Sequence, residues 1–466
     1  MIYDVAVLGG GVIGCAILNK LARIGKNAIL IEKNSDVATE TSKANSGIVH
    51  AGFDATPGTK KAVLNVRGAK LFPKLCQELD VTFIQNGALV IGNDLEKVQE
   101  LYQRGLENGV SGLEVLNRDG LLKLLPDITE NITCGLYAKT SAIVSPYKFT
   151  IALAEEAVIN GASVAFNFDT KKMTKESDYY VIDNGKETIM TKKIVLACGG
   201  EHNQIAEVLG TKKYDIKYRR GEYFLLDKGS MNLCHTVFPL PSKDSKGILV
   251  SPTVHGNIIV GPTSILAENN DTITTDIGLN EIIEKSGNML NDVNLRKNIR
   301  IFSGVRTLVG HDFVIEQDEI NPDVINVTGI CSPGLTASPA IAEEVVKLLG
   351  FDLDEREIKH RHECKKIAFM SEKELNEMIK IDKNYGKIVC RCEMISEAEI
   401  IDAVNSPLKP ISLDGIKRRT RAGMGRCQGG FCFMKVMEII SRERHISIDE
   451  VTKENANSRI IVGNIK

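Results

Sequence analysis

The stretch N-S-G-I-V-H-A-G-F-D at positions 45–54 contains a side chain suited to acid–base chemistry. Histidine titrates closer to neutral pH than other side chains, and His50 is one of only eight histidines in the chain. Glycines lie on both sides of it, and in an extended backbone Ser46, Ile48 and His50 share one face. The alternative interpretation is a core histidine bound to a backbone group.

A second candidate, Arg306, lies in the segment F-S-G-V-R-T-L-V-G (302–310). Gly304 and the apolar neighbours favour a guanidinium that is buried or lines a cleft. Such a group needs an anion as partner. The anion is either an internal carboxylate or one that the protein binds.

Four cysteines near the C-terminus could bind metal. They form C-x-C, then 34 residues, then C-x-x-x-x-C, and they are Cys390, Cys392, Cys427 and Cys432. Structural zinc ligands are usually two to four residues apart, so these spacings lie at the edges of that range. Four thiolates also suit a [2Fe–2S] cluster, which we favour, with zinc and reduced structural thiols as alternatives.

The residues around these cysteines fit an anionic cluster. Glycines would let backbone N–H groups approach the sulfur atoms, and basic residues would help to hold the cluster unless they form a solvated face. The glycines are Gly423, Gly425, Gly429 and Gly430, and the basic residues are Lys417, Arg418, Arg419, Arg421 and Arg426.

The elements that would position these residues begin at the N-terminus. Residues 3–8, Y-D-V-A-V-L, predict a buried parallel strand. A G-x-G-x-x-G triplet, a helix over 12–24 and a second strand over 28–31 follow. This order is typical of a dinucleotide-binding unit.

Each residue of this unit has a physical role. Gly9 permits the tight turn, Gly11 lets the backbone approach a pyrophosphate, and Gly14 lets the helix pack closely on the strand. Glu32 ends the second strand, where its carboxylate can accept hydrogen bonds from ribose hydroxyls. The motif alone does not separate FAD from NAD.

Later segments return to the same unit. Residues 194–200 read as a buried strand that ends in glycines, and 325–349 as a strand, a small-residue loop and a helix. The loop at 329–336 would bring another helix N-terminus near the cofactor. Between these segments, 221–227 and a hairpin that includes 256–263 predict a second sheet, with Arg219, Arg220 and Tyr223 as candidate pocket residues.

Length and composition set the class of protein. A chain of 466 residues suggests two or three domains. The net charge of −2 gives no field that favours nucleic acid or an anionic membrane. No apolar run is long enough for a transmembrane helix, and the N-terminus predicts a strand rather than a signal peptide. The 11 cysteines do not indicate a disulfide framework.

The motifs at 3–14, 45–54, 304–310 and 332–340 resemble those of FAD-dependent oxidoreductases of the D-amino-acid oxidase superfamily, over about residues 1–365. The resemblance is closest to the glycerol-3-phosphate dehydrogenase and oxidase group, with L-2-hydroxyglutarate dehydrogenases as near relatives. It implies FAD rather than NAD, bound by Gly9, Gly11, Val12, Ile13, Gly14, Glu32, Lys33, Thr41, Ser42, Asn45, Ser46, Gly47, Thr170, Gly199, Gly304, Gly334, Leu335 and Thr336.

The resemblance also implies catalytic roles. His50 would accept the substrate's hydroxyl proton while the hydride goes to flavin N5, with Ser46 as its hydrogen-bonding neighbour. Arg306 and Lys246 would hold the substrate's phosphate or carboxylate. Lys243 is the alternative to Lys246, and a plain surface lysine is the other interpretation.

The cysteine spacing resembles the bacterioferritin-associated-ferredoxin-like [2Fe–2S] domain found in anaerobic-type glycerol-3-phosphate dehydrogenase large subunits. We expect a mixed α/β fold: a Rossmann-like FAD-binding domain (about 1–80, 145–210 and 300–365) interleaved with an antiparallel-sheet substrate domain (about 81–144 and 211–299). A linker (366–384) and a small, mainly helical cysteine domain (385–466) would follow.

The sequence therefore predicts a cytoplasmic enzyme that oxidises sn-glycerol 3-phosphate to dihydroxyacetone phosphate. Electrons would pass to a partner subunit or carrier, and any membrane contact would come through that partner. The alternatives are a 2-hydroxy-acid dehydrogenase such as one for L-2-hydroxyglutarate, a less favoured amine oxidase, and a subunit whose cysteine domain serves docking or iron-dependent regulation.

Overall fold

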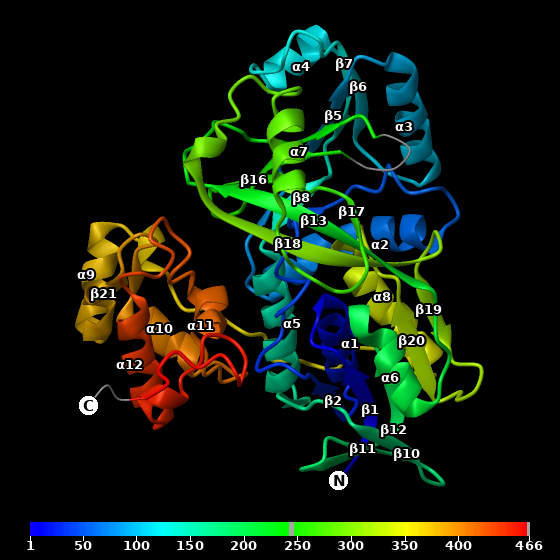
Figure 1. Ribbon diagram of the computed structural model, residues 1–466, viewed down its shortest axis with the longest axis vertical. Helices are drawn as coiled ribbons and strands as arrows, with labels where there is room; N and C mark the ends of the chain where they lie inside the picture. The colour runs from blue at the N-terminus through cyan, green and yellow to red at the C-terminus, as the bar shows by residue number, and fades with distance from the viewer. Residues whose placement is uncertain (242–246, 464–466) are drawn as a thin grey trace.

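The computed structural model describes residues 1–241 and 247–463, and its first sheet carries the glycine-rich turn (Figure 1). Strand β1 (Ile2–Leu8) lies in its middle, between β12 and β2 and parallel to both. β20 continues the sheet beside β12. The remaining bounds are β2 (Ala28–Ile31), β9 (Ser163–Ala165), β10 (Lys172–Lys175), β11 (Tyr180–Asp183), β12 (Thr188–Leu196), β19 (Val314–Gln317) and β20 (Val324–Thr328).

Helices from distant parts of the chain cover this sheet. α1 (Val12–Arg23) packs against both α5 (Pro146–Ile159) and α8 (Gly334–Leu348), and α8 also packs against α2 (Lys60–Glu78). Their apolar side chains form one buried core with β1 and β2. The predicted strands and helices at 3–31 and 325–349 are confirmed, with helix α1 ending at Arg23.

The second sheet is mostly antiparallel and is built around the long strands β13 (Ile216–Leu226) and β18 (Asn298–Val309). One pair, β5 with β14, is parallel, which differs from the purely antiparallel prediction. The hairpin of β15 and β16 is confirmed. The other bounds are β5 (Ala88–Gly92), β6 (Leu113–Asn117), β7 (Cys134–Ala138), β14 (Thr236–Pro239), β15 (Leu249–Pro252), β16 (Ile258–Gly261) and β17 (Ile265–Ala267).

Three helices pack on the second sheet: α3 (Leu95–Glu107), α4 (Arg118–Leu124) and α7 (Asp276–Ser286). α6 (His202–Leu209) instead packs beside β10 and β12 of the first sheet. A small sheet of β3 (Ile48–Val49), β8 (Ala142–Val144) and β4 (Phe83–Ile84) holds the histidine segment.

The C-terminal part is a separate, mainly helical lobe beside α5 (Figure 1). It contains α9 (Glu372–Ile381), α10 (Glu397–Val404), α11 (Leu413–Thr420), α12 (Phe433–Arg444), and the short pair β21 (Ile388–Cys390) and β22 (Ile395–Ser396). Its apolar core is independent of the two large sheets.

Two expected boundaries differ from the structure. The chain leaves the second sheet only after β18, because this strand pairs with β13 along nearly its whole length, so the last FAD-domain segment begins near residue 310 rather than 300. The expected linker contains α9, whose Leu375, Met378 and Ile379 pack with Tyr385 of the cysteine lobe. Across the described residues, no helix is long and apolar enough to span a bilayer.

Candidate functional site

A cavity of about 280 Å³ lies between the carboxyl ends of the first sheet and the face of the second sheet. The residues predicted to bind cofactor or substrate converge on it from several parts of the chain. Those that line it are Gly9, Gly11, Val12, Ile13, Glu32, Lys33, Thr41, Ser42, Asn45, Ser46, His50, Thr170, Gly199, Gly304, Arg306, Gly334 and Leu335.

Three predicted cofactor residues lie behind this lining and shape it. A side chain on Gly14 would collide with the Gly9 carbonyl, and one on Gly47 with the Val144 carbonyl. Thr336 is buried and its hydroxyl accepts the His50 backbone N–H at 2.9 Å. These residues therefore support the cavity wall.

The glycine turn leaves room for a phosphate group beside helix α1. Gly9 has φ +108°, a region that favours glycine. The Ser42 hydroxyl accepts the Val12 N–H at 2.8 Å, which ties the following loop to the helix N-terminus. The turn and helix start fit a pyrophosphate.

Glu32 fits the ribose-binding role. Its carboxylate is buried and accepts the Gly10 N–H at 2.6 Å and the Asn34 N–H at 2.8 Å. Burial raises the pKa of Glu32. A buried carboxylate that lines the cavity has lone pairs to accept hydroxyl groups of a nucleotide, so the residues present fit FAD.

His50 lies where the two sheets meet. Its Nε2 is 3.5 Å from the Ser332 hydroxyl, and its ring lies 6.0 Å from the Phe238 ring. The alternation predicted for this segment holds, since Ser46, Ile48 and His50 all line the cavity. The half-buried imidazole thus lines the cavity and is not enclosed in a hydrophobic core.

Arg306 approaches the cavity from β18. Its Nη2 donates to the Thr263 carbonyl at 2.8 Å, and within residues 1–241 and 247–463 it forms no ion pair with a carboxylate. The neighbouring Tyr223 is buried, and burial raises the pKa of Tyr223. The guanidinium therefore has donors left for an anionic ligand.

The segment 242–246, which includes Lys243 and Lys246, lies outside the described residues. Directly after it, Gly247 and Leu249 line the cavity. Of the three candidates on β13, Tyr223 lines the cavity, whereas Arg220 pairs with Glu222 at 3.1 Å and Arg219 bonds Ser264 at 3.1 Å.

Several lining residues were not predicted. Phe238 and Thr263 belong to the second sheet region, and Ser332 to the loop before α8. Ser332 and Thr263 stand in segments that carry recognisable motifs, so their proximity to the site could have been inferred. Phe238 has no such signal, because an aromatic residue in a strand is usually core.

The four cysteines meet in the C-terminal lobe as two pairs. Cys392 Sγ lies 3.7 Å from Cys427 Sγ, and Cys390 is hydrogen-bonded to Cys432. No group of three or more metal-ligating side chains surrounds one point in the described part of the chain. Two pairs fit a binuclear cluster, in which each iron takes two thiolates, better than one zinc ion.

Backbone N–H groups reach these sulfur atoms as predicted. The Gly423 N–H donates to Cys390. The pKa of Cys390 is lowered to about 6, chiefly by the Cys432 thiol and then by N–H donors such as that of Gly423. Burial opposes a lower pKa for Cys427, but N–H donors from Gly429 and Phe431 outweigh it. One cysteine of each pair, Cys390 or Cys427, is thus favoured as the thiolate that binds metal, while the pKa of its partner, Cys432 or Cys392, is raised.

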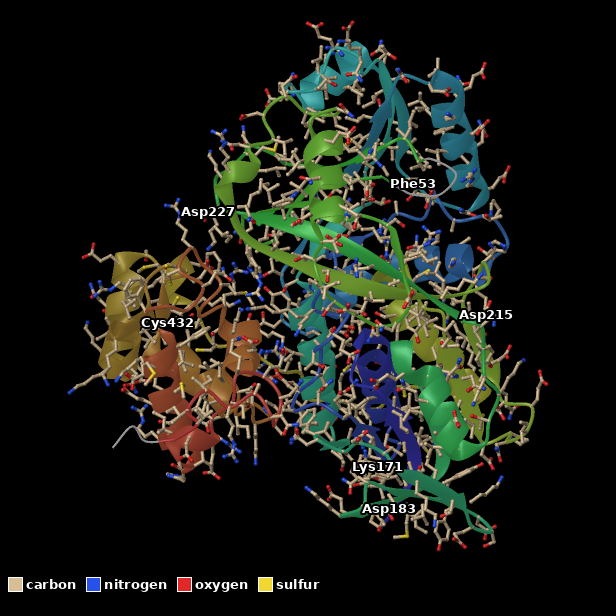
Figure 2. All side chains as sticks on the ribbon, in the orientation of Figure 1. Phe53, Lys171, Asp183, Asp215, Asp227 and Cys432 are labelled. Carbon is tan, nitrogen blue, oxygen red and sulfur yellow. The ribbon has the colours of Figure 1, made fainter. Side chains whose placement is uncertain are left out.

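The predicted role of the basic run is wrong for Arg418 and Arg419. Arg421 pairs with Glu393 at 2.8 Å, and Arg426 pairs with Asp227 at the edge of the second sheet facing the lobe (Figure 2). Arg418 and Arg419 are buried against the FAD-binding domain. Arg418, Arg419 and Arg426 thus join the lobe to the rest of the chain through carboxylates. Arg421 pairs with a carboxylate of the lobe itself and reaches the rest of the chain through Tyr147 and Asn257.

Comparison with known proteins agrees with this geometry. A family model described as FAD dependent oxidoreductase matches residues 4–348, and one described as BFD-like [2Fe-2S] binding domain matches residues 388–442. A glycerol 3-phosphate dehydrogenase from Caloramator mitchellensis is 42% identical over 100% of this chain and 99% of its own length.

Two further relatives cover less of the chain. An L-α-glycerophosphate oxidase structure from Mycoplasma pneumoniae with FAD bound has a TM-score of 0.72 and 30% identity over 76% of this chain and 97% of its own. The human mitochondrial L-2-hydroxyglutarate dehydrogenase is 30% identical over 57% of this chain and 61% of its own. The predicted fold, FAD and a probable [2Fe–2S] cluster are thereby confirmed, and the chain belongs to the FAD dependent oxidoreductase family.

Proposed function

We propose that this enzyme oxidises the secondary hydroxyl of sn-glycerol 3-phosphate to give dihydroxyacetone phosphate. The observation that carries the proposal is that His50 and Arg306 line the same cavity as the FAD-binding turn. The full-length similarity to a glycerol 3-phosphate dehydrogenase supports this choice of substrate.

The residues divide the work by chemistry. FAD, when bound, accepts the hydride from the carbinol carbon. His50 accepts the hydroxyl proton at Nε2, which Ser332 helps to orient. Arg306 binds the phosphate through its planar fork, while Thr263 fixes one of its amino groups. Ser46, which lines the cavity, orients the substrate.

Lys246 completes the proposal as a second cation for the phosphate, on the grounds of the family resemblance. The segment that follows it borders the cavity at Gly247. A point charge and a planar fork together suit a tetrahedral dianion.

A 2-hydroxy acid such as L-2-hydroxyglutarate is the second candidate, because the human dehydrogenase for it is a relative. The same histidine and arginine would serve a carboxylate substrate. The relative covers little more than half of this chain, which favours glycerol 3-phosphate.

We further propose that the cysteine lobe faces an electron-accepting protein or carrier, which would also provide any membrane contact. A [2Fe–2S] cluster, when bound, supplies one-electron transfer. Cys392 is exposed, and Phe431, between Cys427 and Cys432, is 91% exposed. An exposed aromatic residue beside a redox site is suited to contact a partner.

An anaerobic absorbance titration tests the substrate. Glycerol 3-phosphate and L-2-hydroxyglutarate would be added to separate samples while the flavin band is followed. Bleaching by glycerol 3-phosphate alone supports the proposal. Bleaching by the hydroxy acid alone overturns the substrate but leaves the role of His50 intact.

A further inference from the structure

Asp36 is a carboxylate buried at the boundary between the FAD-binding domain and the cysteine lobe, with 1% of its surface exposed. Arg419 donates to its two oxygens at 2.7 and 3.1 Å, and Arg418 donates to Oδ2 at 3.1 Å. Burial alone would raise the pKa of Asp36, but the two guanidinium groups outweigh it and lower that pKa. Asp36 is therefore charged and fully dependent on the C-terminal lobe for its counter-ions.

The two arginines are likewise buried in this contact. They are consecutive residues near the end of α11, and their side chains are 4% and 6% exposed. Arg419 also donates to Glu155 of α5 at 3.2 Å, and Arg418 pairs with Glu454. A buried network of ion pairs thus joins the lobe to the FAD-binding domain.

Asp36 stands in the middle of a segment whose two ends form the cofactor cavity. Residues 32–34 and 39–42 line that cavity. Between them, the Ala38 N–H donates to the Gly10 carbonyl at 2.9 Å, and the Val37 side chain packs against Gly10. The position of Asp36 therefore sets how this segment closes on the glycine turn.

A second contact from the lobe holds the same segment. Lys43 pairs with the Glu454 carboxylate at 2.8 Å, and the Ser35 hydroxyl donates to the Glu454 carbonyl. The lobe therefore holds the segment at Ser35, Asp36 and Lys43, while residues 39–42 between them line the cavity.

We propose that Arg419 and Arg418 are positioning residues of the FAD site, which act through Asp36 from a domain outside the FAD-binding fold. The oxidase structure with FAD bound matches 76% of this chain, so the fold can hold FAD without a full-length counterpart. In this chain, removing the arginines would leave a buried, uncompensated charge within the cofactor segment. The proposal does not depend on which substrate is oxidised.

The test measures FAD retention in full-length variants. Arg419→Met and Asp36→Asn should each raise the dissociation constant for FAD on the order of ten- to a hundredfold, followed by the fluorescence of released flavin. The visible circular dichroism of the remaining bound FAD should change as well. The double variant should bind FAD as tightly as whichever single variant binds it less tightly. The reason is that both substitutions remove the same contact.

Arg23→Met is the matched control. Arg23 is also 6% exposed and pairs with Glu156 at 2.6 Å and Glu78 at 2.7 Å, but it lies at the far end of α1 from the glycine turn. The Arg23→Met variant should have a lower melting temperature without a comparable loss of FAD. If Arg419→Met releases no more FAD than Arg23→Met at a similar loss of stability, the proposal is overturned.

Arg419→Lys keeps the test decisive if Arg419→Met does not fold. Lysine preserves the charge but loses the fork, so FAD release should lie between that of the native chain and that of Asp36→Asn. FAD binding equal to the native value in both Arg419→Lys and Asp36→Asn would show that the contact only joins the domains, and would overturn the positioning role.

Discussion

At the scale of single residues, we propose proton transfer at His50, which directly follows β3 of the small sheet, and anion binding at Arg306 of β18. Replacing His50 by Asn removes the proton acceptor but preserves size and polarity. Flavin reduction by glycerol 3-phosphate should slow by about 10²- to 10⁴-fold in anaerobic stopped-flow measurements, while FAD remains bound.

His235→Asn is the control, because the His235 ring bonds the backbone carbonyl of Asn86 and is not part of the cavity lining. It should reduce flavin at the native rate. A His50→Asn enzyme that reduces flavin within about threefold of the native rate would rule out His50 as the base.

Arg306 should affect binding more than chemistry. Arg306→Lys keeps a cation but loses the fork, so KM for glycerol 3-phosphate should rise roughly tenfold, and Arg306→Met should raise it on the order of a hundredfold. Arg300→Met on the same strand, where the native side chain bonds Gln428, should leave KM unchanged. Equal effects on KM in the two methionine variants would contradict the assignment.

At the scale of elements, the packing of α1 on β1 determines the shape of the glycine turn. Gly14→Ala would push a methyl group into the Gly9 carbonyl, which is backbone and cannot move aside cheaply. We expect purified Gly14→Ala protein to lack flavin absorbance. Gly287→Ala, in open space at the end of α7, should bind FAD normally, and a yellow Gly14→Ala protein would contradict the expected clash.

Helix α11 should make stability depend on pH through Lys417. Burial lowers the pKa of Lys417 to about 8, although the adjacent Asp414 acts in the opposite direction and Arg300, Lys453 and Lys43 add to the lowering. Between that pKa and the ordinary value of 10.5, the unfolded chain binds more protons than the folded one. Stability should therefore rise with pH above about 8, by up to ~1.4 kcal/mol per pH unit.

Thermal unfolding from pH 7 to 10 measures this slope. Lys417→Met should flatten it, while Lys435→Met, at an exposed position of α12 paired with Glu438, should leave it unchanged. Identical slopes in the native chain and in Lys417→Met would show that Lys417 is not the titrating group.

At the scale of the whole molecule, the cysteine lobe contacts both large domains, through Arg419 to the loop after β2 and through Arg426 to the end of β13. Replacing Cys390 and Cys392 by Ser should remove iron and acid-labile sulfide but leave these contacts intact. Flavin reduction by substrate should be retained, and electron transfer to the acceptor should slow.

Cys364→Ser controls for loss of a thiol in general, since Cys364 bonds Tyr385 and stands apart from the two cysteine pairs. It should retain iron and full turnover. Normal acceptor turnover in the Cys390/Cys392 variant would show that electrons do not pass through the lobe.

The sequence predicted the positions of residues that stand in short motifs, and it missed contacts between residues far apart in the chain. Glu32 stands in a short motif whose spacing determines its geometry, so its place in the cavity followed from the chain alone, whereas the place of His50 followed from the family resemblance. Asp36 gave no such signal, because its partners Arg418 and Arg419 are 382 and 383 residues away. Proximity to cysteines in the sequence suggested the wrong partner for these arginines, since a side chain on α11 can face away from the adjacent loop.

The sequence separation between Asp36 and its arginines also affects when this contact can form during synthesis. At about 5–20 residues per second of synthesis, the ribosome adds α11 roughly 20–80 s after Asp36 has emerged. From the synthesis of α8 until that of α11, the nascent flavin fold would carry a carboxylate without its counter-ions. We therefore expect newly made chains to acquire FAD firmly only once translation is complete, so that incomplete chains remain without a working flavin.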